Sequence, residues 1–156
     1  MPPPLPPEEC AERLLRLLTA QGALFAQVRD LAGRLMAPIE AGDTDGLMRV
    51  LSEKQRLMGQ NDRLKAEMAP WLAAWEEARE TADPALRAPV EEALETLRGH
   101  MTAIFGLEEE ARTRLEGARS EAGDRVTRVQ AGKAVLRAYG RPAGEPPPAR
   151  YRDRPS

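Results

Sequence analysis

The chain has 156 residues, of which 42% are hydrophobic and 4% aromatic, and its 23 basic and 25 acidic residues give a formal charge of −2. Alanine, leucine, glutamate and arginine lose little side-chain freedom in a helix, so this composition favours helices over strands. The near balance of charge offers no general attraction to nucleic acid or anionic lipid, and we expect no nucleic-acid partner and no insertion into a membrane.

Both ends of the chain are rich in proline, with five prolines in residues 2–7 and five more after Gly140. We expect residues 1–6 and 140–156 to be disordered, because proline lacks an amide donor and these segments have little apolar mass. The N-terminus lacks the basic and apolar regions of a signal peptide, and no apolar run approaches the roughly 20 residues needed to cross a membrane. With Cys10 as the single cysteine, these features predict a cytoplasmic protein.

The first expected helix covers about residues 7–39. Its large apolar residues recur every three or four positions, which is typical of a helix with one core-facing side. They are Leu14, Leu17, Leu24, Val28, Leu31 and Leu35. Gln21 interrupts this stripe, and we interpret it as a local register effect or a tolerated polar site. Pro38 and the sequence AGDTDG end the helix, and Asp43 or Thr44 is the expected N-cap of the next one.

The second expected helix covers about residues 45–82 and has one broad apolar stripe. The stripe consists of Leu47, Val50, Leu51, Leu57, Met58, Leu64, Met68, Trp71, Leu72 and Trp75, and includes the polar Lys54 and Asn61. Pro70 should kink or split this helix, because it cannot donate to the preceding turn. The two tryptophans share a face one turn apart, which favours packing at one end of a bundle over a ligand cage.

The third expected helix covers about residues 84–139, with Asp83 as its N-cap and Pro84 at its first position. A single helix can continue through the whole segment. Its C-terminal half is weaker, because each of three glycines costs roughly 1 kcal/mol relative to alanine. These are Gly117, Gly123 and Gly132. We expect residues 118–136 to fray in the free protein and to become ordered against a partner or a neighbouring subunit.

The sequence has few residues suited to catalysis. His100 and Cys10 are the only histidine and cysteine, and neither has an evident partner. We interpret the acidic run 108–110 and the basic residues of the C-terminal part as solvated helix faces. No phosphate-binding glycine motif is present. The sequence therefore predicts no catalytic residue, metal site or cofactor.

Together the three helices predict an all-α fold. We expect residues 7–139 to form an elongated antiparallel helical hairpin or a three-helix coiled-coil bundle. If three helices are too few to cover all the apolar stripes, we expect the bundle to be completed by association with further copies of the chain.

The second expected helix begins with GDTDGLMRVLSEKQRLMGQNDRL, in which leucines surround Glu53, Lys54 and Gln55, and the third ends with GKAVLRAYG. With the long first helix, these segments resemble the FlgN-type flagellar export chaperones over about residues 10–140. The resemblance implies a small cytoplasmic chaperone without catalytic residues. Such a chaperone binds the C-terminal helical segment of a hook-associated protein before secretion and prevents its premature assembly. Binding of this kind is a helix-in-groove exchange driven by apolar burial.

The resemblance also implies where the client and the export gate are bound. By position, the client-facing residues are Leu115, Val126, Val129 and Leu136. Tyr139 stands near the place where these chaperones carry a tyrosine used at the export gate, although it can equally cover the end of the bundle. Two alternatives stay open. One is a structural coiled coil that self-associates, and the other is an adaptor whose N-terminal prolines are bound by another domain.

Overall fold

The computed structural model describes the backbone of residues 6–139 and the side-chain surroundings of residues 6–134. Its elements are α1 (Pro7–Gly33), α2 (Met36–Ala41), α3 (Thr44–Ala78) and α4 (Pro84–Tyr139). No strand occurs within the described backbone, and the all-α prediction is confirmed. The predicted disorder of residues 1–6 and 140–156 lies, apart from Pro6, outside the described residues.

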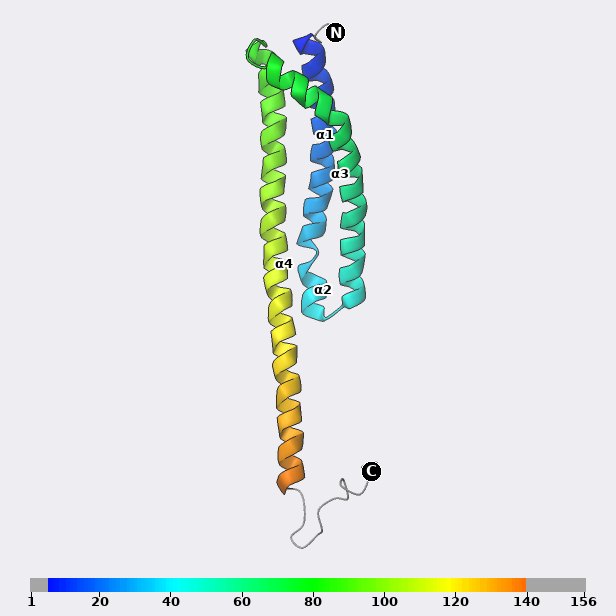
Figure 1. Ribbon diagram of the computed structural model, residues 1–156, viewed down its shortest axis with the longest axis vertical. Helices are drawn as coiled ribbons and strands as arrows, with labels where there is room; N and C mark the ends of the chain where they lie inside the picture. Colours follow the sequence, from blue (N-terminus) through cyan, green and yellow to red (C-terminus); the bar gives the residue numbers. More distant parts are fainter. Residues whose placement is uncertain (1–5, 140–156) are drawn as a thin grey trace, which may run out of the picture. The chain divides into compact units, whose positions relative to one another are not determined.

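The chain divides into two compact units, Met1–Glu116 and Gly117–Ser156. In the first unit, α3 runs antiparallel to α1 and to the N-terminal part of α4, and the three helices form a bundle (Figure 1). The backbones of α1 and α3 approach each other more closely than α4 approaches either. The second unit contains the C-terminal part of α4, from Gly117 to Tyr139.

The first expected helix, about residues 7–39, is broken in the structure: α1 ends at Gly33 and α2 begins at Met36. The expectation that Pro38 acts only at the end of this helix is therefore wrong. In a continuous helix, residue 38 would donate its amide to the carbonyl of Arg34, and a proline ring there collides with that carbonyl. The interruption consequently falls four residues before the proline.

Short side chains cap the two following helices as expected. The Asp43 carboxylate accepts a hydrogen bond from the amide of Gly46 at 2.9 Å, at the start of α3. The Asp83 carboxylate accepts one from the amide of Ala85 at 3.0 Å, at the start of α4. Before α3 the chain reverses at Gly42, whose positive φ of 67° suits glycine, since a side chain is disfavoured there.

The end of α3 turns across α1 toward the start of α4 (Figure 1). Pro70 lies inside this part of α3, where the missing backbone N–H, and with it one helical hydrogen bond, allows the predicted bend. The helix ends at Ala78, earlier than the expected residue 82. Asp83 precedes Pro84, and a residue before proline is disfavoured in the helical conformation, so α3 cannot continue directly into α4. Ala82 is nevertheless buried in the core.

Three groups of buried side chains follow one another along α1 and α2. The first group, near the N-terminal end of α1, consists of Cys10, Ala11, Leu14, Leu18, Met68, Trp75, Ala82 and Val90. The second consists of Leu24, Phe25, Val28, Leu31, Leu57 and Ile104. The third consists of Leu35, Ile39 and Ala111. The apolar residues of the first two predicted stripes, apart from Leu51, belong to these groups or pack against them. Burial of the periodic apolar faces therefore holds the bundle together. No helix within the described residues is sufficiently long and apolar to pass through a bilayer.

Candidate interaction surfaces

Cys10 is a packing residue in this structure. Its side chain is buried near the N-terminus of α1, and its thiol donates to the backbone carbonyl of Trp71 over 3.4 Å. Burial raises the pKa of the Cys10 thiol above its ordinary value, because the thiolate is poorly solvated there. The thiolate is the reactive form of cysteine, so this position opposes nucleophilic chemistry.

We expect Cys10 in the folded protein to react with a thiol reagent such as Ellman's reagent far more slowly than in the urea-unfolded protein. The difference should persist up to about pH 8, where a normal thiol is already partly ionised. Stopped-flow absorbance on both states measures it. Equal rates in the two states would contradict the burial of this thiol.

His100 lies half-buried on α4, and its Nδ1 atom has no hydrogen-bond partner among the described residues. Within the same residues, no three His, Cys, Asp or Glu side chains gather as a metal-binding group. Within the part of the chain that the structure describes, no carboxylate or other side chain is hydrogen-bonded to the Nδ1 atom of His100.

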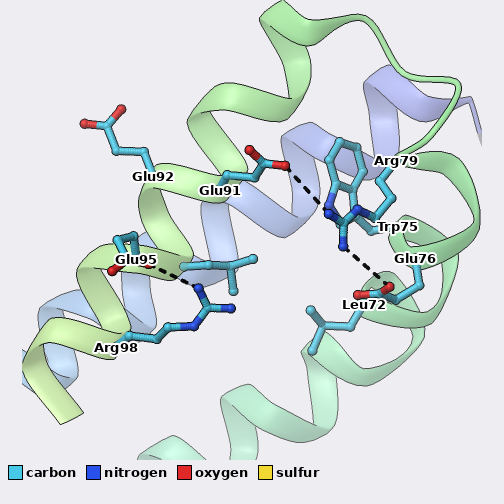
Figure 2. A pocket seen from close by; sticks show the side chains of 9 residues that line it. Leu72, Trp75, Glu76, Arg79, Glu91, Glu92, Glu95 and Arg98 are labelled. Carbon is cyan, nitrogen blue, oxygen red and sulfur yellow. Dashed lines mark hydrogen bonds and ion pairs between the residues drawn. The ribbon is translucent and has the colours of Figure 1, made fainter. Parts of the chain in front are cut away.

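A polar cleft of about 490 Å³ lies between the end of α3 and the start of α4. In Figure 2, Arg79 lies between Glu76 and Glu91, and Arg98 pairs with Glu95. The Arg79 nitrogens lie 3.9 Å from each of their two partners. These side chains are mostly solvent-exposed, and such pairs contribute little energy. The indole of Trp75 stands behind them and is 3% exposed, so the tryptophan serves as packing.

A second cleft, of about 510 Å³, is mainly apolar and is hereafter called the groove. Residues from α1, α3 and α4 line it, namely Gln21, Phe25, Val28, Lys54, Met58, Asn61, Lys65, Leu97, Met101, Ile104, Phe105 and Glu108. Met101 and Phe105 of α4 are 40% and 71% exposed. Large apolar side chains at the rim of an apolar cleft are a common feature of protein-binding sites.

The groove contains a buried polar pair. Gln21 and Asn61 are 6% and 4% exposed, and the Gln21 Nε2 atom donates to Asn61 Oδ1 at 2.8 Å. The pair falls between the first two groups of core residues. Sequence analysis identified both as polar residues within apolar stripes, but it did not pair them. The interpretation of Gln21 as a tolerated polar site is refined, because its amide has a specific partner on the facing helix.

An ion pair joins α3 to α4 beside the groove. Lys54 Nζ lies 2.7 Å from both carboxylate oxygens of Glu108, and both side chains are about one-third exposed. Our interpretation of 108–110 as a solvated face is therefore wrong for Glu108. Three consecutive residues of a helix point in different directions, so the three carboxylates need not share one environment. Glu108 points at Lys54, which lies within the α3 stripe. Glu109 pairs instead with Arg112 on the exposed surface, and hydrogen bonding from this arginine lowers the pKa of Glu109.

The residues expected to face a client occupy exposed positions where the structure describes them. Leu115, in the first unit, is 38% exposed, and Val126 and Val129, in the second, are 57% and 56% exposed. Leu136 and Tyr139 are helical residues of α4, but their side chains lie outside the described residues. Leu115 is not among the residues that line the groove.

Comparison with known proteins found no relative of this chain. No protein-family model, curated protein or solved structure matches the chain. Function must therefore be argued from the two apolar surfaces described above. The exposed valines of α4 were expected from the sequence, but the groove was not. Phe105 and Met101 form its rim only because α1 and α3 provide the opposite wall.

Proposed function

We propose that the chain is a non-enzymatic, cytoplasmic export chaperone that binds the terminal helical segment of a flagellar hook-associated protein and prevents its premature assembly. The observation that carries this proposal is the exposure of Val126 and Val129 on a helix of the second unit. Soluble helices normally bury such residues, so two neighbouring exposed valines favour a surface that is covered by another helix.

The resemblance of the sequence to the FlgN-type chaperones supports the identity of that helix as a client. The glycines of this segment support it as well, since a helix with Gly117, Gly123 and Gly132 is intrinsically weak. A weak helix that gains order on binding can cover a client segment and release it again at the export gate. Tyr139 is the residue we propose for contact with that gate.

The proposal predicts that aspartate at both Val126 and Val129 weakens binding of the client segment by at least about a hundredfold, because each change puts a charge where an apolar side chain would be buried. Calorimetric titration of the full chain with synthetic C-terminal peptides of the same organism's hook-associated proteins measures this. Circular dichroism of the same mixtures should show a gain of helix.

The matched control is Met48→Asp, which also introduces a charge at an exposed apolar residue, 55% exposed, but on α3. This variant should bind the client normally. Failure of every client peptide to bind the unaltered chain would sink the proposal. The unaltered chain could instead be a fully helical oligomer that does not bind the peptides and that dissociates when both valines are changed. This result would establish the self-associating coiled coil.

A further inference from the structure

We propose that the groove is a docking site for an amphipathic helix of another protein, and that this helix carries one amide or hydroxyl side chain within its apolar face. The inference does not rest on the proposed function, since the groove belongs to the first unit and the exposed valines to the second. It would give the chain a second protein partner.

The shape of the groove suits a helix. Its wall on α4 runs from Leu97 to Glu108, a length of about 16 Å or three helical turns. The wider separation of α4 from α1 and α3 leaves this seam open, and a further helix would close it as in a four-helix bundle. Phe105, 71% exposed at the rim, is placed to cover one side of such a helix.

The polar pair in the groove specifies the chemistry of the occupant. Gln21 and Asn61 use one donor and one acceptor in their mutual bond. Gln21 Oε1 and Asn61 Nδ2 have no hydrogen-bond partner among the described residues, and neither is a fully enclosed atom. Both residues are more than nine-tenths buried and line the groove. The groove thus offers one acceptor and one donor, which an asparagine, glutamine or serine side chain satisfies.

The charged residues of the groove indicate a further property of the helix that would bind there. Lys54 is neutralised by Glu108, whereas Lys65 is an exposed lining residue with no ion-pair partner among the described residues. The unpaired charge of the groove is therefore positive, and it favours a helix with a glutamate or aspartate beside its apolar face.

A second copy of the chain is an alternative occupant, and light scattering distinguishes it from a helix of another protein.

The probe is a stapled 14-residue helical peptide with leucines at helical spacing, one asparagine within the apolar face and a glutamate beside it. Fluorescence anisotropy measures its binding to the full-length chain. We expect the peptide to bind, and Phe105→Glu to weaken binding at least about tenfold, because a charge then replaces the rim aromatic. Met48→Glu changes another exposed apolar residue, 55% exposed, that lies outside the groove, and this control should leave binding unchanged.

Two further comparisons test the assigned chemistry. A peptide with leucine in place of asparagine should bind more weakly, because it leaves the two amide groups unpaired. Lys65→Glu should reverse the preference between the glutamate peptide and a lysine version of it.

Absence of binding, or equal losses in the Phe105 and Met48 variants, would overturn the proposal. Light scattering of the chain alone completes the test. A dimer that dissociates on Phe105→Glu would assign the groove to a second copy and overturn the proposal in that way.

Discussion

Trp75→Ala lowers the free energy of unfolding by about 3–5 kcal/mol, the usual range for removing a fully buried tryptophan. Trp75 is 3% exposed and packs in the core group that joins α1, the end of α3 and the start of α4. Protein interiors are close-packed, so removal of the indole leaves a cavity among the side chains of this group. Urea unfolding followed by circular dichroism measures the loss.

Trp71→Ala is the matched control. Trp71 lies one turn earlier on the same helix but is only partly buried, with the Arg13 guanidinium 4.9 Å from its ring centre. An exposed cation–π contact contributes about 0.5–1 kcal/mol, so we expect a clearly smaller loss for this variant. Equal losses in the two variants would contradict the difference in burial between Trp75 and Trp71.

Helix content and capping were predictable from sequence because they are set by neighbours along the chain. Leu14 and Val28 recur in step with a helical face, and Asp43 and Asp83 precede helices that they cap. The break at Arg34 is also local, but its position was missed. Pro38 was treated as the end of a helix, although its steric effect reaches the carbonyl four residues earlier.

The groove was not predictable in the same way, because it depends on how distant helices are placed. Asn61 was noticed as polar within an apolar stripe, yet its partner Gln21 lies 40 residues away and is selected by the register of α1 against α3. Lys54 was noticed too, but Glu108 lies 54 residues away. Phe105 follows the buried Ile104 on α4 and is itself exposed, so periodicity alone gave no reason to select it.

Removing one partner of the buried Gln21–Asn61 pair has the second large effect on stability. Asn61→Leu lowers the free energy of unfolding by about 1–3 kcal/mol, because the Gln21 donor loses its partner within a mainly apolar site. Gln21→Leu has a similar cost for the same reason. Urea unfolding of the single and double variants forms a complete double-mutant cycle.

In the double variant the two leucines have no polar atoms that need partners. We therefore expect its free energy of unfolding to be close to that of the unaltered chain, or higher. The pair then contributes little net stability, and its role is to fix one register of α1 against α3, as single polar residues do in coiled coils. Amide exchange and light scattering test this role. The double variant should show more than one helix pairing or oligomer, and a double variant with a single helix pairing and a single oligomeric state would contradict this role.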